Sequence, residues 1–214
     1  MLLPSDANPN QGIYAQRRAR LIESLREGVV VVPTAPECVR NGDAHYAYRY
    51  DSYFYYLTGF QEPEAVLAII GGREPRSVLF CRERDPEREI WDGYRYGCAA
   101  ARTAFGFDEC HPISELDALM PELLANQPAL HCHLGDDARW DARVFSWLNA
   151  LRARARSGVR APDAIRDVRA AISEMRVCKD RHEIAAMRRA GAIAVAAHRR
   201  AMRATRPVSG VEMT

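Results

Sequence analysis

Four consecutive valines at positions 29–32 are the feature that most restricts what this chain can fold into. They stand between Gly28 and Pro33, two residue types that interrupt regular structure. A run of β-branched residues without polar alternation is typical of a buried strand. We therefore expect the valines to form a strand inside the core.

Apolar spacing along the rest of the chain predicts helices and strands in mixed order. The "ALHCHLG" segment at 129–135 predicts another strand, whereas residues 34–47, which include "NGD", have turn chemistry and are expected to be a loop. Helical spacing is found over 13–27, 97–105, 114–125 and 137–156. This order predicts an α/β fold with a mixed β-sheet flanked by helices.

An aromatic run at residues 48–59, "YRYDSYFYYLTG", contains five tyrosines and a phenylalanine. Large side chains fall on both odd and even positions over 53–58, which predicts a strand that presents rings on both faces. Gly/Pro turns connect this run to "AVLAII" and then to "SVLFCR". We expect three consecutive antiparallel strands.

A second structural unit is predicted near the end of the chain. In "KDRHE", Asp180 and Glu183 have the spacing of a capping box, and apolar residues then recur every three to four positions. Pro207 and Gly210 are expected to end this long helix. The predicted domains are residues 1–176 and residues 177–214, the second comprising a linker and the opening helix of a truncated domain.

Charge and composition exclude several classes of protein. The net charge is +2 and arginines alternate with acids, as in "RERDPERE", so we expect no nucleic-acid partner. No apolar run reaches the roughly eighteen residues of a membrane span, and no basic leader precedes an apolar stretch, so a cytoplasmic protein is expected. Without any CxxC pair, the cysteines are expected to be reduced and partly buried. They are Cys38, Cys81, Cys98, Cys110, Cys132 and Cys178.

The sequence offers few candidate site residues. His131 and His133 flank Cys132, and strand alternation would put both imidazoles on one face, but no third ligand accompanies them. We expect strand histidines there and no metal site. Phosphate-binding glycine motifs and the GxSxG nucleophile motif are absent from the sequence, so no complete active site is predicted.

Trp91 is the remaining candidate. It stands beside Asp92 and Gly93, after the predicted "SVLFCR" strand has ended, and we expect it to lie in a loop. A tryptophan in such a position is either a residue that fills the core or part of a contact surface, where Trp and Arg are enriched. The sequence leaves both alternatives open.

Three segments together resemble a known family. They are "YRYDSYFYYLTGFQEPEAVLAI" with Asp43 upstream, "SVLFCRERDPEREIWDGYRYG", and "AISEMRVCKDRHEIAAMRRAGAIAVAAHRRAM". In that order they are similar to the bacterial aminopeptidase P branch of the Xaa-Pro aminopeptidases, within the creatinase/prolidase superfamily. The resemblance implies an N-terminal α/β domain, followed by a metallopeptidase domain of the "pita-bread" fold.

The resemblance also implies an activity and an assembly for the full-length protein. The family removes the residue that precedes proline at a peptide's amino end, with two divalent metal ions, typically manganese, and works as a homotetramer. Its metal ligands lie beyond the opening helix, so we expect no catalytic residue and no metal ligand in this chain. The N-terminal domain is expected to restrict access to the cleft.

Two site residues follow from the resemblance. Trp91 matches a tryptophan that reaches a neighbouring subunit's active site, and Arg156 matches an arginine near the substrate entrance, with Arg154 as the alternative. The aromatic run is expected to serve the core first and an interface second. A prolidase, or a non-catalytic peptide-binding or protein-binding module of the same fold, remains the alternative function.

Overall fold

The computed structural model describes residues 8–205 and divides the chain into two compact units, Met1–Ser173 and Glu174–Thr214. Each unit is described by itself below. The predicted helix end at Pro207 and Gly210 lies outside the described residues. The predicted domain boundary between residues 176 and 177 stays a prediction.

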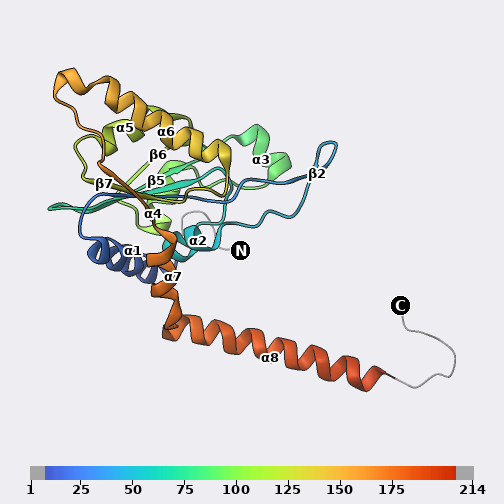
Figure 1. Cartoon of the computed structure of the whole chain (residues 1–214). Helices are drawn as coiled ribbons and strands as arrows, with labels where there is room; N and C mark the ends of the chain where they lie inside the picture. The colour runs from blue at the N-terminus through green and yellow to red at the C-terminus, as the bar shows by residue number, and fades with distance from the viewer. Residues whose placement is uncertain (1–7, 206–214) are drawn as a thin grey trace. The chain divides into compact units, whose positions relative to one another are not determined.

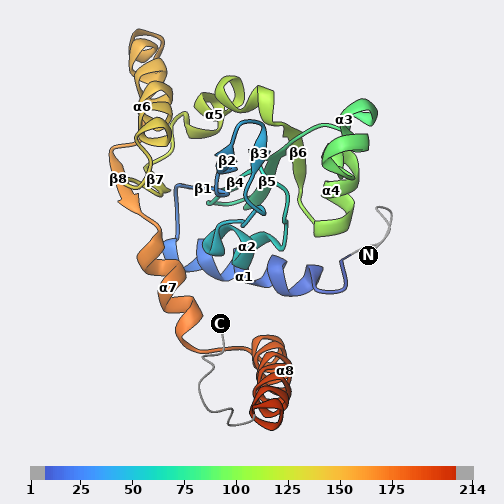
Figure 2. The same ribbon diagram turned by 90° about the vertical axis from the view of Figure 1, so that its right-hand side faces the viewer.

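The first unit is built on a six-stranded sheet (Figure 1), whose strand order β6-β5-β4-β1-β7-β8 can be followed from right to left in Figure 2. The valine run forms β1, which pairs antiparallel with β4 on one side and parallel with β7 on the other. The strands are β1 (Val29–Pro33), β4 (Val66–Ile70), β5 (Arg76–Cys81), β6 (Glu109–Pro112), β7 (Ala129–Cys132) and β8 (Ala164–Asp167). The predicted mixed α/β fold is confirmed.

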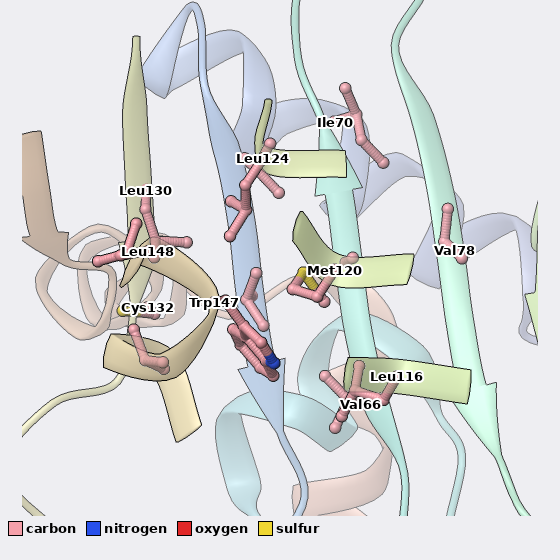
Figure 3. Close-up of a cluster of buried hydrophobic side chains, with 14 of the residues drawn as sticks. Val66, Ile70, Val78, Leu116, Met120, Leu124, Leu130, Cys132, Trp147 and Leu148 are labelled. Atoms are coloured by element: carbon pink, nitrogen blue, oxygen red, sulfur yellow. The ribbon is translucent and has the colours of Figure 1, made fainter. Parts of the chain in front are cut away.

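Helices cover both faces of this sheet (Figures 1 and 2). On one face, α5 and α6 enclose the main apolar core, in which Met120, Leu124, Trp147 and Leu148 lie over the strands (Figure 3). On the other face lie α1, α2 and α4. The helices are α1 (Gln11–Leu25), α2 (Ser52–Thr58), α4 (Gly97–Phe105), α5 (Leu116–Leu124) and α6 (Ala138–Ala153). Two helical layers thus bury the four valines of β1 completely.

The aromatic run is a helix, so the prediction of a strand over 53–58 is wrong. The Asp51 side chain accepts hydrogen bonds from the amides of Tyr53 and Phe54, at 2.8 and 2.7 Å, which starts helix α2. Gly59 ends it in the left-handed conformation, with φ of +67°. Phe54, Leu57 and Thr58 are fully buried, a helical spacing that the density of rings on every position obscured. Of the three predicted antiparallel strands, only β4 and β5 form.

Two buried arginines of α1 hold this helical layer together. Arg18 donates to the carbonyls of Leu57 and Gly106, at 3.0 and 2.7 Å, so it joins the ends of α2 and α4. Arg17 donates to the Tyr56 carbonyl at 3.1 Å. The last carbonyls of a helix have no partner within it and carry its negative end, so guanidinium groups suit them. Burial lowers the pKa of Arg18 to about 10, so the group stays charged at neutral pH.

Several shorter elements were not predicted. The segment at 34–47 contains a small hairpin of β2 (Val39–Asn41) and β3 (Ala44–His45), not only a loop. Trp91 lies in the short helix α3 (Pro86–Asp92), so its placement in a loop is wrong. Asp85 caps this helix and Pro86 occupies its first turn, a signal that the charged surroundings hid. Strand β8, helix α7 (Arg169–Val177) and two 3-10 turns were not predicted either.

The second unit contains α8 (Arg181–Ala204), and its predicted capping box is confirmed. The Glu183 amide donates to the Asp180 carboxylate at 2.8 Å, and the Asp180 amide donates to the Glu183 carboxylate at 3.0 Å. Apolar side chains along α8, among them Met187, Ile193 and Met202, are exposed. Within residues 8–205, none of the helices has the length and apolar character that crossing a bilayer requires.

Replacing the residue that caps α2 should test why the aromatic run is a helix. We expect Asp51→Ala to lower the free energy of unfolding by about 1–2 kcal/mol, because two amides lose their acceptor, and Asp51→Asn to retain most of it. Asp43→Ala, in the exposed β2–β3 hairpin, is the control and should cost less than about 0.5 kcal/mol. Urea denaturation measures all three. Equal losses for Asp51→Ala and Asp43→Ala would contradict the capping role.

Candidate functional site

Most strands of the first unit end at the same edge of the sheet. Strands β1, β5, β6, β7 and β8 all end there, because β4 alone runs in the opposite direction. We call this the carboxyl edge, defined by Pro33, Cys81, Pro112, Cys132 and Asp167 as the last residues of those strands. Ligands of open α/β sheets bind beyond the carboxyl ends of strands, so this edge is the first place to look for a site.

A cavity of about 820 Å³ lies at the carboxyl edge, beyond β1 and β7. Its lining holds more acidic than basic groups, so its electrostatics suit a cationic group. The acids are Glu37, Asp51, Glu64, Asp136, Asp137 and Asp141, facing His133 and Arg143. Several of these acids already have structural partners: Asp51 caps α2, Asp137 caps α6, and Asp141 accepts from the Gly135 amide at 3.1 Å. The cavity is therefore acidic, but three of its six acidic side chains already bind backbone amides.

The two histidines of "HCH" are buried on the face of the sheet opposite the main core. Leu130 and Cys132 belong to that core, whereas the His133 ring packs edge-on against Tyr53 of α2, with ring centres 5.5 Å apart. Burial lowers the pKa of both His131 and His133, and a backbone hydrogen bond with Glu27 acts against this for His131. Among the described residues, neither imidazole belongs to a group of three possible metal ligands.

Trp91 does not fill the core. Its side chain is 87% exposed on α3, and its neighbour Ile90 is 77% exposed. Charged pairs fix the ends of this helix: Arg84 binds Glu89 through two bonds of 3.1 and 3.0 Å, and Arg95 binds Asp92. Of the two alternatives that the sequence left open, the core residue is excluded. The contact surface stays a prediction.

Arg156 lies in the 3-10 turn Ala155–Ser157 that follows α6, and it is exposed. It forms no ion pair with any residue in the described range 8–205, whereas Arg154 is paired with Glu122 of α5. Of the two arginines, Arg156 is thus the one whose guanidinium is available to a ligand. The structure does not bring it near Trp91, because α3 and α6 lie on opposite sides of the first unit (Figure 2).

Sequence reasoning missed a cluster of three thiols. Cys81, Cys98 and Cys110 come from β5, α4 and β6, and their sulfur atoms all lie within 4.8 Å of one another. A hydrogen bond with Cys110, together with burial, raises the pKa of Cys81, while the same bond lowers that of Cys110. Burial raises the pKa of Cys98 to about 12. No spacing signal could have found them, because only sheet pairing and helix packing bring them together.

Comparison with known proteins gives matches to one family, the Xaa-Pro aminopeptidases. The model of the family described as "Aminopeptidase P, N-terminal domain" matches residues 14–131. The Xaa-Pro aminopeptidase of Escherichia coli is 40% identical over 91% of this chain and 45% of its own length; for that of Haemophilus influenzae the values are 34%, 91% and 43%. The chain therefore spans less than half the length of these relatives.

Solved structures that resemble this chain belong to the same family as these relatives. Aminopeptidase PepP of Pseudomonas aeruginosa superposes with a TM-score of 0.89 at 39% identity, over 94% of this chain and 46% of that one. Zinc-substituted Escherichia coli aminopeptidase P in complex with product gives 0.90 at 38% identity, with the same coverage. Sequence and fold thus point to one family.

The buried histidines predict a pH dependence of stability. Their pKa in the folded state is below the value of 6.5 for an exposed histidine, so the unfolded chain binds more protons and stability falls as the pH drops through about 6.5. We expect the melting temperature to fall between about pH 7.5 and pH 5.5, and to fall less in His131→Gln. His45→Gln, at an exposed position, is the control. Identical slopes in both variants would contradict this origin.

Proposed function

Because the chain belongs to the aminopeptidase P family, we propose that it is the N-terminal part of a Xaa-Pro aminopeptidase, an enzyme that releases the residue preceding proline from the amino end of a peptide. The observation that supports this most is the combination of 40% identity and a TM-score of 0.90, each over more than nine-tenths of the chain. Neither match is confined to one motif.

In this proposal the reaction takes place outside the described residues. Among residues 8–205, the one group of three or more possible metal ligands is the thiol cluster, which does not fit a pair of manganese ions, because manganese prefers carboxylate, imidazole and water ligands. The divalent ions of the full-length enzyme would then be held by the half that the relatives have beyond this chain. The first unit would restrict which peptides reach them.

We propose that Trp91 contacts a neighbouring subunit of a homo-oligomer, close to the substrate. Exposure supports this proposal in addition to the family resemblance. The Trp91 side chain is 87% exposed on a short, capped helix, and its apolar surface is unfavourably hydrated in the free subunit. A contact that buries this surface would be favourable. Ile90 beside it adds apolar area to the same surface. Helix α3 fixes the backbone that carries both side chains, which lowers the cost of ordering them in a contact.

We place Arg156 near the substrate entrance of the full-length enzyme, as a group that attracts or orients the peptide. Its exposure supports this assignment over Arg154, whose charge is already compensated by Glu122. A guanidinium that has its donors unused can bind a peptide carbonyl or carboxylate.

Replacing Trp91 tests the contact. In a protein that continues into the second half of its relatives, we expect Trp91→Ala to lower kcat/KM by roughly 5- to 30-fold, the equivalent of about 1–2 kcal/mol for a buried contact residue. The melting temperature of the first unit should hardly change, because the side chain is exposed. Ile90→Ala is the matched control on the same helix and should have the smaller kinetic effect. A large drop in melting temperature with normal kinetics would instead make Trp91 a packing residue.

The proposal also predicts what the chain does alone. We expect the 214-residue chain neither to bind Mn²⁺ stoichiometrically nor to cleave Xaa-Pro peptides, because the described residues offer no set of carboxylates and imidazoles for this ion. Calorimetric titration with Mn²⁺ and a peptide assay measure this. A chain extended by the second half serves as the positive control. Stoichiometric Mn²⁺ uptake by the 214-residue chain would overturn the proposed division of roles.

A further inference from the structure

Three cysteine side chains meet at the carboxyl ends of β5 and β6, under the first turn of α4. We propose that the thiolates of Cys81, Cys98 and Cys110 form a binding site for one thiophilic metal ion, Zn²⁺ being the ion that suits them best. This departs from the expectation, drawn from the family resemblance, that the chain contains no metal ligand. It is independent of the manganese ions of the proposed peptidase.

The distances between the sulfur atoms fit a common metal ion. Cys81 Sγ and Cys110 Sγ lie 3.6 Å apart, and all three sulfur atoms are within 4.8 Å of one another. With Zn–S bonds of about 2.3 Å and tetrahedral angles, bound thiolates are roughly 3.8 Å apart. Small side-chain rotations are therefore enough to bring the three sulfur atoms to one ion.

The backbone around the cluster keeps the three residues in place. In the parallel pair β5–β6, Leu79 lies opposite Cys110, and Cys81 lies opposite Pro112, so the two cysteines are diagonal neighbours on one face of the sheet. Cys98 comes from the second residue of α4, where Gly97 adopts a positive φ of +67°. A Cβ at Gly97 would lie 2.7 Å from the Arg84 side chain, so only glycine lets α4 begin this close to the end of β5.

Diagonal placement favours a metal over a disulfide. A disulfide needs the two sulfur atoms at about 2.05 Å, and residues that are not directly opposite resist this approach without a backbone shift. A metal ion leaves the sulfur atoms roughly 3.8 Å apart, close to the distance found between Cys81 and Cys110. On binding, each thiol proton passes to solvent and each sulfur forms one bond to the ion, so no oxidant is needed.

The surroundings offset the charge of the bound state. Three thiolates around Zn²⁺ leave one net negative charge, and Arg102 lies one helical turn beyond Cys98 on α4 and acts electrostatically on Cys110. The amide groups in the first turn of α4 add a positive potential at Cys98. Both features favour thiolate over thiol once an ion is present.

A cavity borders the cluster on the side of Cys98. This cavity of about 730 Å³ is lined by Cys98, together with Glu83, Tyr94 and Pro112, among other residues. Glu83 is exposed and within electrostatic range of Cys98. Water, or the Glu83 carboxylate, can thus complete a tetrahedral site, and the cavity gives the ion a path of entry.

Titration with metal alone tests the site. The reduced, metal-free 214-residue chain is titrated with Cd²⁺, whose bonds to thiolate give an ultraviolet charge-transfer band, and with Zn²⁺ in competition with a chromogenic chelator. We expect one ion per chain and a higher melting temperature with Zn²⁺. In Cys98→Ser, and likewise in Cys110→Ser, we expect the Cd²⁺ band to shrink. The affinity should fall by more than the roughly 10- to 100-fold that is typical of losing a residue that only hydrogen-bonds a metal ligand.

The remaining cysteines provide the matched control. Cys38→Ser/Cys178→Ser removes two exposed thiols outside the cluster and should leave stoichiometry and affinity unchanged. Circular dichroism melts of the metal-free variants establish that each one folds, and Cys98 and Cys110, which are only half-buried, are safer positions to change than the buried Cys81. The proposal is overturned if the folded parent chain takes up no stoichiometric ion, if the cluster variants bind as the parent does, or if non-reducing mass spectrometry of the chain as purified, before any reductant is added, shows a Cys81–Cys110 disulfide.

Discussion

The fold of the first unit depends on burying β1 from both sides. Its four valines are inaccessible to solvent, so the strand needs partners along both edges and apolar layers on both faces. β4 pairs with one edge of β1 in antiparallel orientation, and β7 pairs with the other edge in parallel orientation, so the sheet is mixed. The layer of α5 and α6 covers one face, and that of α1, α2 and α4 covers the other (Figure 1). The order of the remaining strands then determines which loops meet at the carboxyl edge.

The two helical layers are stabilised by different physics. Between α5, α6 and the sheet, large apolar side chains such as Trp147 and Met120 interlock, and dispersion and the hydrophobic effect dominate (Figure 3). On the opposite face, the short helix α2 also needs partners for its last carbonyls, and Arg17 and Arg18 of α1 provide them from within the protein. An arginine that is buried beside unpaired carbonyls satisfies groups that would otherwise lose hydrogen bonds to water.

The candidate functional groups of the first unit differ in how far they are exposed to solvent. Three of the six carboxylates around the acidic cavity cap a helix or bind a turn amide, so they stabilise the local backbone. Trp91 on α3 and Arg156 in the turn after α6, which the family resemblance singled out, are both exposed. The thiol cluster is different, because it is sheltered between β5, β6 and α4 and needs no partner chain to be assembled.

The sequence by itself determined the buried strand at Val29, the strands β4, β5 and β7, most helices, the capping box at Asp180 and the family. Each of these depends on a pattern of residues that are close together in the sequence. It could not decide whether residues 53–58 form a strand or a helix, since rings at every position hide the period that burial later reveals. Nor could it show that Trp91 is exposed or that Cys81, Cys98 and Cys110 meet. Only the tertiary structure decided these, because side chains distant in sequence become neighbours through strand pairing and helix packing, which no local pattern encodes.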